Sequence, residues 1–255
     1  MDRVITIPVL GDNLTYVYLY DQSNALVVDP GDSSSVLRIL EKHELSLAKI
    51  LVTHHHWDHV AGVDELKNKT GCEVLGGDKK IPAVDRVVDD RNILEVGDAR
   101  VQVIGTPGHT RTTVCYYLQP SKENASGILW TGDTLFVGGC GRLLECDART
   151  MWDSLAKLAS LADETLVYCG HDYTVENYEF ALSIEPDNQA VKQRLQEVKQ
   201  AQRAGRPTVP STIFQERTTN AFLRAAAAEL KAALNMHEAS PVEVFAELRR
   251  RKDFF

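Results

Sequence analysis

One short stretch, residues 53–62 (THHHWDHVAG), restricts the possible folds of this chain more than any other. It holds four of the protein's eight histidines together with an aspartate. The letters before it, KILVT, form a short apolar run typical of a buried strand, so the histidines begin where that strand ends. Alternate residues of an extended segment share a face, so we expect His54 and His56 to point together and His55 to point away.

Three other apolar runs also end in a side chain that can bind a metal. VQVIGTPGH ends in His109, GILWTGD in Asp133 and TLVYCGH in His171, and a glycine precedes each of these residues. Glycine permits the tight backbone that a converging site needs. Asp58 and His59 follow the first run, where a helix is expected to begin. A fold that uses all of these groups must bring four strand ends together.

Imidazole and carboxylate groups without thiolate form a ligand set suited to zinc, iron or manganese. Seven such ligands are too many for one tetrahedral ion. They suit two ions about 3.5–4 Å apart that share a carboxylate and a water molecule. The sequence therefore predicts a site with two divalent ions, held by His54, His56, Asp58, His59, His109, Asp133 and His171.

The order of apolar and helical patterns predicts two domains. Strand-like runs alternate with helical patterns through the first two-thirds of the chain, which indicates layered α/β packing. We predict a β-rich catalytic domain over residues 1–174 and an all-helical domain over residues 175–255. Helical patterns cover residues 33–44, 59–71, 149–162, 176–185, 188–205 and 219–235.

The last helix has the clearest start signal in the sequence. Ser240 can act as its N-cap, Pro241 occupies the first helical position, and Glu243 can complete a capping box. We therefore expect a helix to begin directly after Ser240.

Charge and cysteine content restrict the partners and the compartment. The net charge of −8 argues against nucleic acid, which needs a basic protein face. Five cysteines without a C-x-x-C pair fit a reducing compartment. No secretory signal or bilayer-spanning apolar segment is visible. We expect a cytoplasmic monomer that binds neither membrane nor nucleic acid.

The constellation of histidines and aspartates closely resembles the metallo-β-lactamase superfamily. The resemblance implies an α/β (α+β) fold, a four-layer αβ/βα sandwich with a dinuclear site at one edge of its two sheets. It also implies catalytic roles for Asp58, which would bind metal and orient the water, and Asp133. In that arrangement one ion is held by His54, His56 and His109, the other by Asp58, His59 and His171, and Asp133 bridges the two.

Three further stretches are similar to the glyoxalase II family, the hydroxyacylglutathione hydrolases. They are GGCGRLLE (residues 138–145), CGHDYT (169–174) and RRRKDFF (249–255). That family carries a helical C-terminal domain, so the resemblance spans nearly the whole chain. It implies that glutathione is contacted by Arg142, Tyr173, Arg249 and Lys252.

The reaction implied by this resemblance is hydrolysis of S-D-lactoylglutathione to D-lactate and glutathione. A hydroxide bound by two divalent ions, zinc before iron or manganese, would attack the thioester, in methylglyoxal detoxification. Two positions depart from the family pattern. Leu144 stands where an aromatic residue is common and would remove one glutathione contact. Thr113 replaces a second histidine, which predicts altered surroundings of the metal ligands rather than lost activity.

Other functions remain open. The foremost is a glutathione persulfide dioxygenase of the same superfamily with a single iron, which the complete second ligand set and the basic C-terminal motif disfavour. A nuclease of this superfamily would need a basic groove to bind nucleic acid, which the net charge of −8 disfavours. A non-catalytic metal-binding module would not need an open dinuclear site.

Overall fold

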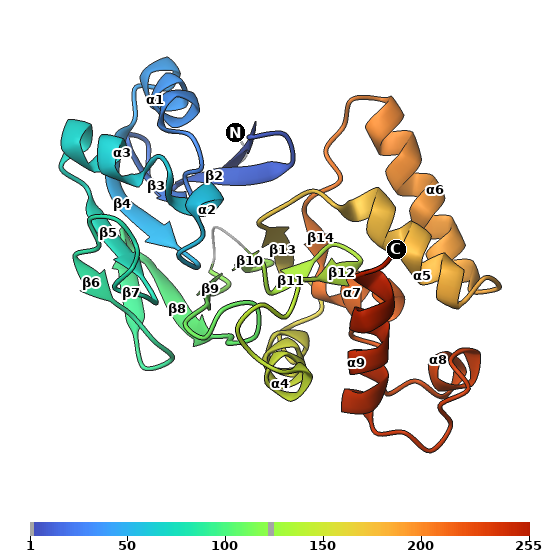
Figure 1. Cartoon of the computed structure of the whole chain (residues 1–255). Helices are drawn as coiled ribbons and strands as arrows, with labels where there is room; N and C mark the ends of the chain where they lie inside the picture. Colours follow the sequence, from blue (N-terminus) through green and yellow to red (C-terminus); the bar gives the residue numbers. More distant parts are fainter. Residues whose placement is uncertain (1–2, 122–124) are drawn as a thin grey trace. The chain divides into compact units, whose positions relative to one another are not determined.

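The computed structural model describes residues 3–121 and 125–255 (Figure 1). The chain forms two compact units. Unit 1 comprises Met1–Gly105 and Thr112–Gly132, and unit 2 comprises Thr106–Arg111 and Asp133–Phe255. These two units are defined by contacts within the chain and do not test the predicted domain boundary at residue 174, which stays a prediction.

Unit 1 contains a six-stranded sheet with helices beside it. Its first strands pair antiparallel and its last strands pair parallel, with β3 and β4 parallel neighbours near the middle. The α1 and α3 helices bury Val36, Leu40, Val63 and Leu66 in the same core as these strands. The elements are β1 (Val4–Val9), β2 (Asn13–Leu19), β3 (Asn24–Val28), α1 (Ser33–Lys42), β4 (Ser46–Val52), α2 (Trp57–Val60), α3 (Val63–Thr70), β5 (Glu73–Gly76) and β6 (Arg86–Val87).

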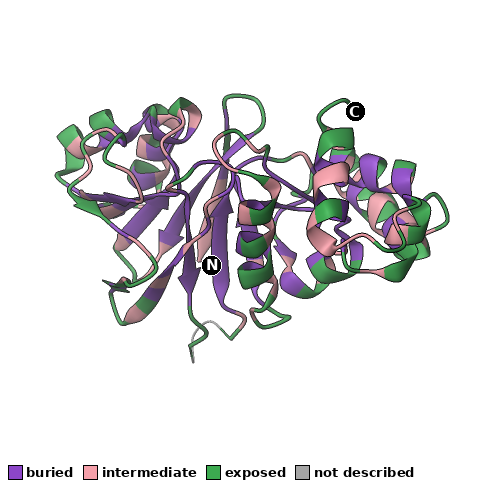
Figure 2. Cartoon of the chain, turned by 60° about the horizontal axis from the view of Figure 1, so that its bottom comes forward, coloured by how far each residue is buried: buried purple, intermediate pink, exposed green. Residues whose placement is uncertain are grey.

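A second group of antiparallel strands completes unit 1. Tyr116 connects it to the first sheet, because its buried hydroxyl donates to the carbonyl of Val52 at 2.9 Å. The ring of Tyr18 packs edge-on against Trp130, 5.6 Å between centroids. In Figure 2 the strands are mostly buried, whereas the helices are exposed on one side. The strands are β7 (Ile93–Val96), β8 (Ala99–Gly105), β9 (Val114–Leu118) and β10 (Ile128–Gly132).

Unit 2 is mainly helical. Its apolar core includes Phe180, Phe222 and Phe245, whose rings lie 5.9 Å apart in successive pairs. Ser240 caps the last helix and forms a capping box with Glu243, which confirms the predicted start. The elements are β11 (Leu135–Phe136), β12 (Gly139–Cys140), α4 (Ala148–Ala159), β13 (Leu166–Cys169), α5 (Thr174–Ile184), α6 (Gln189–Arg203), β14 (Ser211–Thr212), α7 (Ile213–Thr219), α8 (Ala228–Ala233) and α9 (Pro241–Lys252).

Two predicted helices differ from the structure. The pattern over residues 219–235 does not form one helix: Thr219 ends α7, residues 221–226 form turns, and Ala228–Ala233 is helical. The carbonyl oxygen of the Asn220 side chain accepts from the amide of Phe222 at 3.0 Å and starts the turn. The pattern over 59–71 breaks near Gly62, whose amide donates to the carbonyl of Pro30 at 2.8 Å. Tertiary contacts override helix propensity at both places.

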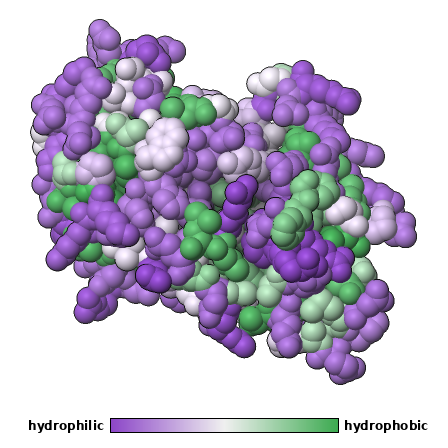
Figure 3. All heavy atoms as spheres, in the orientation of Figure 1, coloured by the Kyte–Doolittle hydropathy of each residue, from purple (hydrophilic) through white to green (hydrophobic). Residues whose placement is uncertain are grey.

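The face of the molecule drawn in Figure 3 is mostly polar. Figure 3 shows one face of the molecule, on which hydrophilic side chains predominate and apolar ones form separate smaller groups. Within residues 3–121 and 125–255, no helix is both long enough and apolar enough to cross a bilayer.

Gly132, the last residue of β10, combines a left-handed backbone with a close neighbour. Its φ is +47°, and an added Cβ would lie 2.2 Å from Oγ1 of Thr53. We expect Gly132→Ala to lower the free energy of unfolding by more than about 1–2 kcal/mol, the cost of the left-handed conformation alone. Urea denaturation measures the loss.

Gly71 supplies the matched control, because its φ is +71° but no atom lies within 4 Å of an added Cβ. Gly71→Ala should therefore show the conformational cost without a clash. Equal losses in the two variants would contradict the role given to the contact with Thr53.

Candidate metal centre

In unit 1 the chain turns directly after β4 and places the predicted ligands on that turn. His54 Nε2 lies 3.1 Å from His56 Nδ1, so these two rings meet as expected. His55 Nδ1 instead lies 3.3 Å from a carboxylate oxygen of Asp78. The short α2 helix then carries Asp58 and His59, and His59 Nε2 lies 3.5 Å from Asp58 Oδ2.

In unit 2 the other three predicted ligands meet around one oxygen atom. His109 Nε2 and His171 Nε2 each lie 3.4 Å from Asp133 Oδ2. His109 lies on the segment between β8 and β9, Asp133 directly follows β10, and His171 follows β13 closely. All three side chains are buried.

These spacings fit divalent metal ions. Ligand atoms about 2.0–2.1 Å from a tetrahedral ion lie roughly 3.3–3.4 Å from one another. The separations within each unit, from 3.1 to 3.5 Å, bracket that value. Every predicted ligand also belongs to a group of three His or Asp side chains that could hold an ion. The donor set therefore indicates divalent metal binding.

A buried carboxylate beside the unit 1 turn was missed from the sequence. Asp29 follows β3 and has a φ of +48°, unusual for a residue other than glycine. Its Oδ1 accepts from the Thr53 amide and its Oδ2 from the Thr53 hydroxyl, both at 2.7 Å. Oδ2 also accepts from His59 Nδ1 at 3.1 Å. A carboxylate on the second ring nitrogen orients a metal-binding histidine, and the strand ending in VVDPG was the available signal.

Further hydrogen bonds orient neighbouring groups. The Thr53 hydroxyl donates to Asp29, so it accepts from His54 Nδ1 at 3.1 Å. Asn13, in the unpredicted β1–β2 hairpin, donates from Nδ2 to Asp58 Oδ2 at 2.9 Å. In unit 1 the side chains of His54, His59 and Asp58 are thus oriented by hydrogen bonds to neighbouring residues.

The second nitrogens of the unit 2 histidines also have partners. His109 Nδ1 donates to the backbone carbonyl of Arg142 at 2.9 Å. His171 Nδ1 lies 3.2 Å from the hydroxyl of Tyr173, and the two rings stack 5.0 Å apart. Two residues predicted to bind substrate therefore lie directly beside predicted metal ligands.

The two predicted cations of α9 already face carboxylates. Arg249 is only 5% exposed, and its Nε and Nη2 lie 3.0 and 2.9 Å from Asp253 Oδ1. Its Nη1 donates to the carbonyl of Cys140 at 2.8 Å. Lys252 pairs with Glu176, and the Lys252 side chain is 7% exposed.

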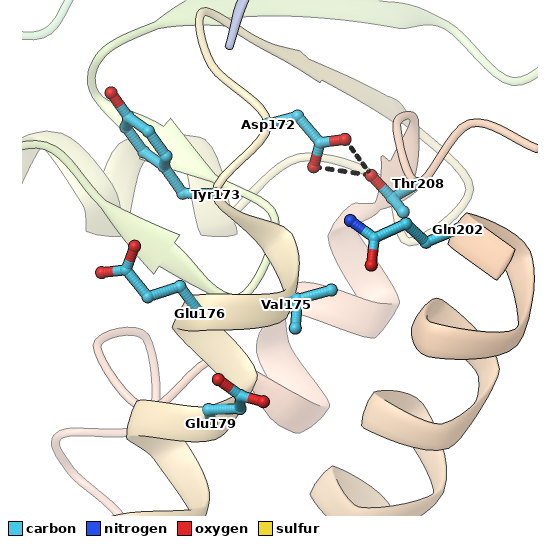
Figure 4. Close-up of a pocket in the computed structure, with 7 residues that line it drawn as sticks. All are labelled: Asp172, Tyr173, Val175, Glu176, Glu179, Gln202 and Thr208. Atoms are coloured by element: carbon cyan, nitrogen blue, oxygen red, sulfur yellow. Dashed lines mark hydrogen bonds between the residues drawn. The ribbon is translucent and has the colours of Figure 1, made fainter. Parts of the chain in front are cut away.

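A surface pocket opens beside Tyr173 (Figure 4). The figure shows the side chains of Asp172 and Tyr173 diverging from the turn before α5. The hydroxyl of Thr208 donates to both carboxylate oxygens of Asp172, at 2.6 and 2.7 Å, and the Thr174 hydroxyl donates to Oδ1 at 2.7 Å. These bonds fix the turn that carries Tyr173. The pocket is lined by Asp172, Tyr173, Val175, Glu176, Glu179, Gln202 and Thr208.

The cysteines near these groups are not suited to nucleophilic catalysis. Burial raises the pKa of Cys140 to about 11 and that of Cys169 to about 12, so both thiols stay protonated at neutral pH. Of the two departures from the family pattern, Leu144 is 58% exposed and Thr113 is buried beside β9.

The contacts of Asp29 predict that it acts on the metal centre. Asp29→Asn keeps the shape of the side chain but removes the charge that faces His59. We expect metal affinity to fall about 10–100-fold, as is typical for such partners of ligands, measured by competition with a chromophoric chelator.

Asp32→Asn is the matched control. Asp32 caps α1 through the amide of Ser35 at 2.8 Å, and asparagine caps equally well. Unchanged affinity in both variants would show that Asp29 has no effect on the metal.

Comparisons with known proteins cover the whole chain. The metallo-beta-lactamase superfamily model matches residues 10–83 and 73–171, and the hydroxyacylglutathione hydrolase C-terminus model matches residues 172–255. A hydroxyacylglutathione hydrolase from Rhodospirillum rubrum is 45% identical over 98% of this chain and 97% of its own. One from Chromohalobacter salexigens is 45% identical over 100% of both chains.

Solved structures show the same fold. ETHE1 from Myxococcus xanthus aligns with a TM-score of 0.68 and 24% identity, over 97% of this chain and 89% of that chain. The B3 metallo-beta-lactamase BLEG-1 aligns with a TM-score of 0.64 and 23% identity, over 86% and 99%. The predicted metallo-β-lactamase fold with a helical C-terminal domain is confirmed. The chain belongs to the hydroxyacylglutathione hydrolase family of the metallo-beta-lactamase superfamily.

Proposed function

We propose that this protein hydrolyses thioesters of glutathione with 2-hydroxy acids, S-D-lactoylglutathione above all, to the acid and glutathione. The observation that carries the proposal is its similarity, along the whole chain, to relatives named hydroxyacylglutathione hydrolase. The histidine and aspartate ligands in both units support metal-dependent hydrolysis. With D-lactate as product, the reaction would serve methylglyoxal detoxification.

The proposal includes two ions per chain, held by ligands from both units. Chain connectivity supports it. Asp133 follows Gly132, which packs against Thr53, the neighbour of His54. His109 lies three residues before Thr112, whose hydroxyl donates to Asp78 at 2.7 Å, the carboxylate that also faces His55.

The division of ligands follows the family resemblance. Zinc is the foremost candidate, and the mixed histidine and carboxylate set also accepts iron or manganese. One ion would be held by His54, His56 and His109, the other by Asp58, His59 and His171, with Asp133 shared.

The chemistry would divide between metal and protein. Bound divalent ions lower the pKa of water and polarise the thioester carbonyl. Asp58, held by Asn13, would orient the attacking water. The leaving thiol has a pKa of about 8.5, so no strong general acid is required.

Glutathione would be held by the basic residues of unit 2, Arg142, Arg249 and Lys252, together with Tyr173. The carboxylates of glutathione would displace the protein carboxylates that now pair with these cations, Asp253 at Arg249 and Glu176 at Lys252. Arg249 also holds the carbonyl of Cys140, so its replacement should disturb both binding and the local backbone.

We further propose a cytoplasmic monomer that binds neither nucleic acid nor membrane. The net charge of −8 supports the first exclusion. The five cysteines form no disulfide in the structure as described, which agrees with a reducing compartment.

The main alternative is a glutathione persulfide dioxygenase with a single iron. The full-length similarity to hydroxyacylglutathione hydrolases favours the hydrolase. Oxygen consumption with glutathione persulfide, in the absence of thioester hydrolysis, would establish the alternative.

The first prediction concerns the reaction itself. Purified protein should release one thiol for each S-D-lactoylglutathione consumed, and it should contain close to two first-row metal ions per chain. A chelator should abolish turnover, and added zinc should restore it, as measured by thiol titration. Full activity with one tightly bound ion would contradict the two-metal proposal.

The second prediction concerns the resident carboxylate at Lys252. Glu176→Gln removes the acid that competes with substrate for the ammonium. Glu176 is the exposed partner of this pair, and ion pairs at the surface contribute about 0.2–1 kcal/mol. We therefore expect KM for the glutathione thioester to fall about 1.5- to 5-fold, with kcat unchanged. Lys252→Ala should instead raise KM roughly 10–100-fold.

Glu179→Gln is the matched control. Glu179 lies on the same helix and lines the same pocket, but it pairs with Lys199 at 2.6 Å. If KM falls equally in both variants, the cause is the loss of negative charge from α5 in general, and a specific exchange at Lys252 is refuted.

A further inference from the structure

The segment of unit 2 that spans residues 136–142 and includes β12 is packed too tightly for side chains at its glycines. We call it the glycine loop. Gly138 has a φ of +71°. A Cβ added at Gly139 would lie 2.5 Å from Nδ2 of Asn177. A Cβ added at Gly141 would lie 1.9 Å from the carbonyl oxygen of Asp133. The loop backbone therefore lies directly against α5 and against a predicted metal ligand.

Buried side chains of α7 and of its C-cap, Asn220, hold this backbone. Glu216 Oε2 accepts from the amide of Gly138 at 2.9 Å. Asn220 Nδ2 donates to the carbonyl of Gly139 at 3.0 Å and to Glu216 Oε2 at 2.9 Å. Glu216 and Asn220 are both fully buried, so each bond replaces one that water would otherwise make.

Two other helices contribute in the same way. Asn177 of α5 donates from Nδ2 to the carbonyl of Val137 at 3.0 Å. Arg249 of α9 donates to the carbonyl of Cys140 at 2.8 Å. Successive backbone groups of the glycine loop are thus fixed by side chains from three separate helices.

The carboxyl group of Glu216 is costly at this position. Burial raises its pKa, which means that the ionised form is disfavoured relative to water. An apolar residue would avoid this cost, but it could not accept from the loop amide. The polar pair of Glu216 and Asn220 therefore defines a backbone conformation rather than simply filling the core.

The far end of the glycine loop reaches the metal centre. The carbonyl of Arg142 accepts from His109 Nδ1 at 2.9 Å. A proton on Nδ1 leaves Nε2 as the nitrogen that can bind metal, and Nε2 lies 3.4 Å from Asp133 Oδ2. The Gly141 amide also donates to the carbonyl of Thr134, next to Asp133, at 3.3 Å.

We propose that Glu216 and Asn220 are positioning residues of the metal centre. Through the glycine loop they fix the Arg142 carbonyl, which sets the tautomer and direction of His109. The helical part of the chain then shapes the metal site as well as holding substrate. The inference rests on the metal site of the proposed function, although its readout does not require turnover.

The experiment measures Co²⁺ binding to metal-free protein, by chelator competition and by the visible spectrum of the loaded protein. Glu216→Ala removes the acceptor and should weaken Co²⁺ binding about 10–100-fold and change the spectrum. Glu216→Gln keeps an acceptor oxygen and should restore both to near wild type. Arg142→Ala keeps the backbone carbonyl, so its Co²⁺ affinity should be unchanged while KM for the thioester rises.

Two controls separate positioning from stability. Leu230→Ala removes a buried side chain of α8 in the same unit, so it should lower Tm without changing Co²⁺ affinity. Thr218→Ala alters an exposed residue of α7 and should change neither. Each variant is compared with wild type at a temperature where both are folded.

Wild-type Co²⁺ affinity and spectrum in Glu216→Ala would overturn the inference. So would an equal loss of affinity in Leu230→Ala, because the effect would then follow stability alone. A wild-type protein that binds Co²⁺ but hydrolyses no glutathione thioester would refute the proposed function, and the affinity comparison would still decide the role of Glu216.

Discussion

In four of the five histidines predicted to bind metal, one ring nitrogen is held by a protein group. A histidine can direct one nitrogen at an ion only if the other is fixed, because ring orientation and tautomer are set together. The partners are of three kinds: a hydroxyl, a carboxylate and a backbone carbonyl. They are Thr53 for His54, Asp29 for His59, the Arg142 carbonyl for His109, and the Tyr173 hydroxyl for His171.

The need to orient these histidines explains why buried polar groups lie next to the segments that carry them. Asp29 and Glu216 are carboxyl groups at positions where apolar side chains would be cheaper to bury. Each accepts hydrogen bonds from backbone amides as well as from a side chain. They hold the segments that carry ligands, so the strands and helices behind those segments contribute to the chemistry through backbone position.

The proposed ligands could be chosen from the sequence because they follow a local rule. Apolar strand patterns are visible in short windows, and each ended in a histidine or an aspartate, as for His109 and His171. The start of α9 was equally local, with Ser240 and Glu243 three residues apart. The pattern over residues 219–235 failed because alanine-rich helix propensity was overridden by the turn that Asn220 begins.

The supporting residues could not be predicted in the same way. Glu216 meets Gly138 across 78 positions of sequence, and His59 meets Asp29 across 30. Such pairs follow from tertiary packing. The apolar run that ends in Asp29 marks that residue but not its partner, and no local pattern marks Glu216. The competing carboxylates at Lys252 and Arg249 were likewise absent from the motif-based prediction, which treated both cations only as substrate ligands.

We propose that one chain holds two ions at a shared carboxylate. X-ray absorption spectroscopy on zinc-loaded protein tests it most directly, because it measures metal–metal and metal–ligand distances without a crystal. We expect a metal–metal distance of about 3.5–4 Å with nitrogen and oxygen ligands only. A spectrum with no metal–metal contribution at two bound zinc ions per chain, or with sulfur ligands, would contradict it.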